Sequence, residues 1–79
     1  MEASFAPMTE ESRRTYEQVA RVLRRSAAAA EALACGLRSG GHGIVASEAT
    51  VRGHLLAAHA EYLEVMERTG LCPGRASTP

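Results

Sequence analysis

Apolar residues recur at helical spacing through the first half of the chain. Steps of three and four residues place side chains on one face of a helix. Thr9 is the expected N-cap of this helix, and Ser39-Gly40-Gly41 is its expected end. The sequence therefore predicts a helix over residues 9–38. Its apolar stripe consists of Tyr16, Val19, Leu23, Ala30, Leu33 and Leu37, with Ser26 at the one polar position.

The second half of the chain carries a similar signal. Ser47 is the expected N-cap of a second helix, and Gly70 suits the left-handed residue that often follows a helix. We predict a loop over residues 39–46, a helix over 47–69, and flexible segments at 1–8 and 71–79. Residues 9–70 then form one domain. Its predicted fold class is all-α, an antiparallel two-helix hairpin.

The second helix is apolar over a wider arc than a single neighbouring helix covers. Its apolar positions spread over about half of the helix circumference, and one neighbour needs less. A second copy of the chain would cover the remainder, so we expect dimerisation into a four-helix bundle. The residues expected at this dimer interface are Val51, Leu55, Leu56, Leu63 and Met66.

The charges favour the antiparallel pairing. Residues 12–26 carry five Arg and one Glu, whereas the C-terminal part of the second helix carries three Glu and one Arg. In a hairpin that folds near residue 42, Arg24 faces Glu61 and Arg21 faces Glu64. The basic run is then explained within the hairpin. The net charge is zero and the sequence pI is about 6.8, so no global field attracts nucleic acid and no nucleic-acid partner is expected.

Composition and cysteines bear on the compartment. The chain lacks Lys, Asn, Asp and Trp and is rich in Ala, Arg and Gly, as in proteins of bacteria with GC-rich genomes. Residues 1–11 lack the apolar segment of a secretion signal, and no apolar run approaches the ~20 residues that span a bilayer. We expect a cytoplasmic protein with no membrane partner. The hairpin would separate Cys35 and Cys72 by about 40 Å, too far for a disulfide, and Cys35 is expected in the core.

His59 is the most suggestive residue for chemistry, because it lies within the apolar face of the second helix. With Arg52 to hold an anion and Tyr62 as donor, it would form a ligand-binding site, to which Tyr16 is a further candidate. The alternative is a structural His, hydrogen-bonded at the core or the interface. No catalytic pair stands at a diagnostic spacing, and His54 and His59 point in different directions. We therefore expect no catalytic residues, no metal and no cofactor.

One segment resembles a known family. Residues 47–55, Ser-Glu-Ala-Thr-Val-Arg-Gly-His-Leu, resemble the start of the recognition helix in the LuxR-type helix-turn-helix family. Under this resemblance, the residues that approach DNA would be Thr50, Val51, Arg52 and His54. The family's scaffold helix has no counterpart here, because the glycine-rich residues 39–43 occupy its place.

Three functions follow as hypotheses. The first is a homodimeric helical module that binds a protein or peptide partner, motivated by the wide apolar face and the absence of catalytic motifs. The alternative is a small enzyme or ligand-binding protein with a pocket at the dimer interface, acting on a peptide or natural-product intermediate. The second alternative is a DNA-binding transcriptional regulator, which the zero net charge disfavours.

Overall fold

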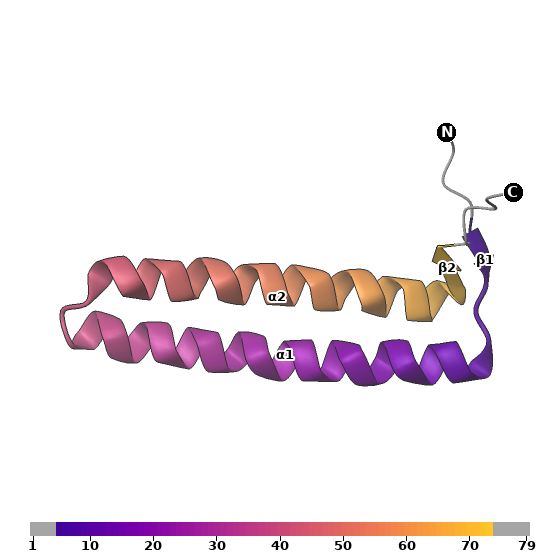
Figure 1. The fold of residues 1–79 in the computed structure, drawn as a ribbon, viewed down its shortest axis with the longest axis horizontal. Helices are drawn as coiled ribbons and strands as arrows, with labels where there is room; N and C mark the ends of the chain where they lie inside the picture. The colour runs from indigo at the N-terminus through magenta and orange to yellow at the C-terminus, as the bar shows by residue number, and fades with distance from the viewer. Residues whose placement is uncertain (1–4, 74–79) are drawn as a thin grey trace, which may run out of the picture.

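Two long antiparallel helices lie side by side and make up most of the molecule (Figure 1). The computed structural model describes residues 5–73. Helix α1 spans Glu10–Ser39 and helix α2 spans Gly43–Thr69. Strand β1, Phe5–Pro7, precedes α1, and strand β2, Leu71–Pro73, follows α2. The predicted helical hairpin is confirmed. No helix among the described residues is both long and apolar enough to cross a membrane.

Local capping chemistry sets the start of α1 and the end of α2. The hydroxyl of Thr9 accepts a hydrogen bond from the backbone N–H of Ser12 at 3.0 Å, which confirms the predicted N-cap. Gly70 has a φ of 74°, and its N–H donates to the carbonyl of Met66 at 2.9 Å. The predicted glycine cap of α2 is therefore also confirmed.

The loop between the helices is shorter than predicted. It comprises residues 40–42, and α2 begins at Gly43, four residues before the expected start at Ser47. The N–H of Ala46 donates to the carbonyl of His42 at 2.9 Å, which is the first helical hydrogen bond of α2. Ser47 thus lies inside the helix. Gly41, with a φ of 85°, provides the sharp turn that the short loop requires.

The segments that flank the helices form a small sheet where flexible ends were expected. β1 and β2 pair antiparallel, with Ala6 opposite Cys72. The N–H of Met8 also donates to the carbonyl of Gly70 at 2.7 Å. These segments meet because α1 begins and α2 ends at the same end of the hairpin (Figure 1). The rest of the predicted flexible segments, residues 1–4 and 74–79, lies outside the described residues.

Small residues line the contact between the two helices. Each helix carries three small residues spaced seven apart, and the first and third of each set are buried alanines. The sets are Ala20, Ala27 and Ala34 in α1, and Ala46, Gly53 and Ala60 in α2. A Cβ atom placed on Gly53 would lie 3.4 Å from both the Ala27 carbonyl oxygen and the Ala30 Cβ. The helix axes approach closely along this line of small residues.

The large apolar side chains lie mostly outside this contact. No large side chain of the described residues is fully buried. In the predicted stripe of α1, Tyr16, Leu23 and Leu37 are half-buried, but Val19 is 42% exposed and Leu33 is 58% exposed. The stripe is therefore wider than the face that α2 covers. Cys35, predicted in the core, is exposed, and both Cys35 and Cys72 are free thiols.

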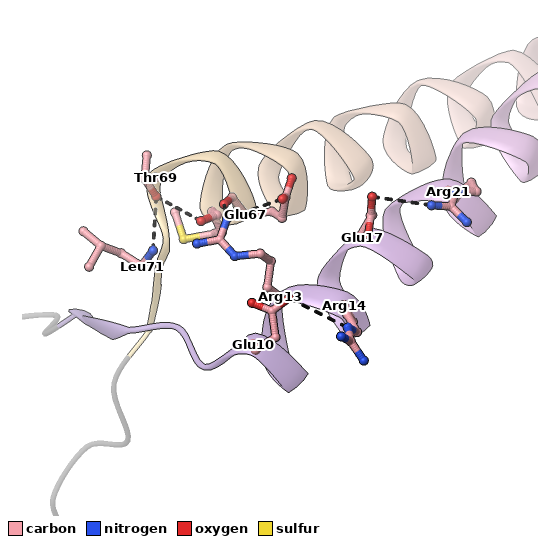
Figure 2. A network of polar contacts seen from close by, with 9 residues as sticks. Glu10, Arg13, Arg14, Glu17, Arg21, Glu67, Thr69 and Leu71 are labelled. Atoms are coloured by element: carbon pink, nitrogen blue, oxygen red, sulfur yellow. Dashed lines mark hydrogen bonds and ion pairs between the residues drawn. The ribbon is translucent and has the colours of Figure 1, made fainter.

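Ion pairs join the helices along one edge. Arg24 donates two hydrogen bonds to the carboxylate of Glu64, at 2.7 and 3.0 Å, and lies 4.0 Å from Glu61. The predicted Arg24–Glu61 pair is confirmed, with Glu64 as the closer partner. The predicted Arg21–Glu64 pair is wrong, because Arg21 pairs with Glu17 in its own helix at 3.6 Å (Figure 2).

Arg13 joins the two helices at the open end of the hairpin. It reaches from the first turns of α1 to the last turn of α2 (Figure 2). Its guanidinium donates to the backbone carbonyl of Glu67 at 2.8 Å and lies 3.5 Å from the Glu67 carboxylate. A cation at this position stabilises the C-terminal end of α2, because the last carbonyls of a helix carry partial negative charge.

Candidate functional site

The outer surface of α2 carries large exposed apolar side chains. Ile44 is 86% exposed, Leu55 is 66% exposed and Val51 is 57% exposed. They remain outside because α1 contacts α2 through the seven-residue repeat of Ala46, Gly53 and Ala60. Exposed aliphatic side chains of this size, gathered on one helix, are typical of a binding surface.

These side chains line an open groove of about 710 Å³ that extends along α2 from Ile44 to His59. Its lining residues fall into two rows with steps of four, and such rows form parallel ridges on a helix. The first row consists of Ile44, Glu48, Arg52 and Leu56. The second row consists of Ser47, Val51, Leu55 and His59. Each row carries two large apolar residues among its four, and the first carries one acid and one base in its centre.

The groove contains two of the four residues predicted to bind a ligand. Arg52 and His59 both line it. Tyr62 and Tyr16 are not among its lining residues. Tyr16 lies near the open end of the hairpin, where partial burial raises the pKa of its hydroxyl, and nearby Cys72 and Tyr62 raise the pKa further. The structure thus places the predicted ligand residues in two separate groups.

The predicted interface residues also divide. Val51, Leu55 and Leu56 line the groove, whereas Leu63 and Met66 are half-buried farther along α2. Sequence reasoning missed three lining residues, Ile44, Ser47 and Glu48, because it assigned the first to a loop and the others to a helix start. The steps of four from Ile44 to Leu56 and from Ser47 to His59 are the signal that identifies them.

The arrangement around residues 47–55 differs from a helix-turn-helix. In that motif the preceding helix crosses the recognition helix at a steep angle. Here α1 and α2 run side by side along their lengths (Figure 1). The hydroxyl of Thr50, which would approach DNA, accepts a hydrogen bond from Arg38 of α1 at 3.1 Å and donates to the Ala46 carbonyl at 3.0 Å. Thr50 is thus engaged within the hairpin.

The other hollows on the surface are weaker candidates for a functional site. Two hollows on the charged edge are both lined by Arg24, which already pairs with Glu64. Within residues 5–73, no three His, Cys, Asp or Glu side chains gather as a metal ion requires. The Cys72 thiol lies 3.8 Å from the Ala6 carbonyl oxygen inside the small sheet. The groove on α2 is therefore the best candidate site among the described residues.

Comparison with protein-family models, with curated proteins and with solved structures finds no significant match to this chain. The function is therefore inferred from the groove and its surroundings alone.

Proposed function

We propose that this protein is a small helical binding module that docks against another polypeptide through the groove on α2. The observation that carries the proposal is the distribution of side-chain size. Alanines and Gly53 occupy the buried positions of the two helices, while Ile44, Val51 and Leu55 are exposed on α2. Burying a Val, Leu or Ile side chain contributes about 1.5–3 kcal/mol, and here that free energy is available to a partner.

The shape of the groove supports a helical partner. Ridges spaced by four residues accept the ridges of another helix, and this packing class is the commonest between helices in globular proteins. An apolar surface with a few central charges also matches the composition of known helix-binding grooves. A homodimer and a complex with another protein or peptide both satisfy these requirements.

Site-specific photocrosslinking tests the proposal. A photoreactive amino acid replaces Leu55 in the groove, and in a matched control it replaces Ala28 on the charged edge. We expect a discrete covalent adduct with a polypeptide from position 55 and none from position 28. The adduct should disappear when Val51→Glu is added, because a charge in the groove opposes apolar docking. Equal labelling from the two positions, or no adduct from position 55, would refute the proposal.

A second candidate is a ligand-binding site in the same groove, favoured by Arg52 and His59 at its lining. An anion on an apolar ligand would pair with Arg52, and His59 would donate a hydrogen bond or act as a base. Under this candidate, His59→Gln abolishes ligand binding or turnover and leaves the helical hairpin intact. Unchanged adduct formation at position 55 in the His59→Gln variant favours the polypeptide partner.

A further inference from the structure

We propose that the occupant of the groove is a second copy of this chain, with the two α2 helices crossing in antiparallel sense about a two-fold axis near residue 50. This inference rests on the proposed function, because it names the partner for the same groove. The first row of the groove carries a pattern of charged and apolar residues that supports a second copy.

The row reads apolar, acidic, basic, apolar at equal steps of four residues: Ile44, Glu48, Arg52 and Leu56. Glu48 and Arg52 lie two residues on either side of residue 50, about 3 Å along the helix axis. Ile44 and Leu56 lie six residues on either side, or about 9 Å. A two-fold axis at residue 50 therefore places charged residues opposite charged residues at about 3 Å and apolar residues opposite apolar residues at about 9 Å.

The charges decide the direction of the second helix. In antiparallel sense, Glu48 faces Arg52 of the second copy, and the same pair forms again by symmetry. In parallel sense, Glu48 faces Glu48 and Arg52 faces Arg52, and like charges in contact oppose association. Neither Glu48 nor Arg52 forms an ion pair with any other residue from 5 to 73, so both charges are available to a partner.

The apolar residues then match across the axis. Ile44 lies beside Leu56 of the second copy, and the same contact forms again by symmetry. When ridges with steps of four pack against each other, the two helices cross at about −50°. This angle confines the contact to the middle of the overlapping segment. The groove from Ile44 to His59 has this limited length. A contact of this size is small for a dimer, so we expect reversible association in roughly the micromolar range.

A charge-exchange experiment tests the inference on the full chain. In the Glu48→Arg variant both facing charges become positive, and in the Arg52→Glu variant both become negative. We expect each variant alone to self-associate at least roughly tenfold more weakly than the natural chain, because like charges now face each other. An equimolar mixture of the two variants should form a one-to-one heterodimer, because each Arg then faces a Glu. Sedimentation velocity measures all three associations, and circular dichroism checks that the helices persist.

The outcomes separate the two proposals. If the natural chain stays monomeric while the crosslinker at position 55 captures a different polypeptide, the second-copy inference is overturned and the binding function stands. If the natural chain dimerises but the charge variants associate equally well alone, the antiparallel pairing is overturned. Failure of the mixture to associate better than its components also overturns it. If position 55 captures nothing and the chain is monomeric, both proposals fail.

Discussion

Gly53 lies in the middle of α2 and directly against α1. Its Cα faces the Ala27 carbonyl oxygen and the Ala30 methyl group, and a Cβ atom would meet both at 3.4 Å. That distance is the lower limit of ordinary van der Waals contact, so alanine fits with at most a slight adjustment of α1. The small residues along this seam let the helices approach closely. They also contribute little hydrophobic free energy, because each buries at most one methyl group.

Two substitutions at Gly53, one small and one large, test how closely α1 and α2 pack. We expect Gly53→Ala to raise the free energy of unfolding by about 0.5–1 kcal/mol, because alanine favours helix over glycine and the methyl group fits. We expect Gly53→Leu to lower it by about 1–3 kcal/mol, because the larger side chain forces the helices apart. Urea denaturation followed by circular dichroism at one chain concentration measures both. Destabilisation by alanine comparable to that by leucine would contradict the described spacing.

Gly36 and Gly70 form a matched pair for a second test. Gly70 has a φ of 74°, where a side chain is strained, and an added Cβ would lie 3.2 Å from the Arg13 guanidinium. Gly36 lies inside α1, and an added Cβ would meet nothing within 4 Å. We expect Gly70→Ala to lower the free energy of unfolding by about 1–2 kcal/mol. Gly36→Ala should raise it by about 0.5–1 kcal/mol. Thermal unfolding compares the two, and the same sign for both would refute the assigned C-cap.

At the scale of the elements, the ion pairs along one edge hold α1 and α2 in register. Hydrogen bonds from Arg24 lower the pKa of the Glu64 carboxyl, and the same bonds raise the pKa of the Arg24 guanidinium. Because the carboxyl has a lower pKa in the folded chain than in the unfolded chain, the pair stabilises the fold above the unfolded pKa. That stabilisation is lost as the pH falls through the folded pKa.

This linkage predicts an acid-dependent stability. We expect the melting temperature to fall as the pH drops below about 4.5, and to fall less steeply in Glu64→Gln, which has no carboxyl to protonate. Glu31→Gln is the control, since Glu31 forms no ion pair with the other residues described. Added salt should reduce the difference, because the pair is exposed. Identical pH profiles for the natural chain and Glu64→Gln would contradict this role.

The ends of the helices show how far the sequence alone predicts the fold. Thr9 and Gly70 are predictable because capping depends on residues within one turn. The start of α2 at Gly43 is not, because Gly40, Gly41 and Gly43 precede Ile44 and local propensity disfavours a helix there. Tertiary contact overrides that preference, since Ala46 is completely buried in the first turns of α2. The β1–β2 pairing is likewise a consequence of the hairpin and has no local signal.

The candidate site is predictable to the same partial extent. The excess apolar arc identifies Val51, Leu55 and Leu56, because helical periodicity is a property of the sequence. It does not identify which part of the arc α1 covers. That choice depends on the close packing of the small residues, which a count of large apolar residues overlooks. Ile44 and Glu48 consequently become part of the site only when the start of α2 is known.

At the scale of the whole molecule, the buried and exposed residues are distributed in an unusual way. Within residues 5–73 the buried apolar residues are all alanines, and ten large apolar side chains are exposed. Chains of this size bury a smaller fraction of their surface than larger domains do, so oligomerisation often supplies additional stability. Under the proposed function, association through α2 would also stabilise the hairpin. Stability should therefore rise with chain concentration.

Sedimentation equilibrium of the full chain tests this account most directly. Across a series from about 1 µM to about 1 mM, we expect the mean mass to rise reversibly from that of the 8.4 kDa chain towards twice that value. The Leu55→Glu variant should keep its helices and remain at the mass of one chain throughout, because its substitution places a charge in the groove without touching the alanine contact. A natural chain that stays at 8.4 kDa over the whole series, with its hairpin intact, would contradict the account.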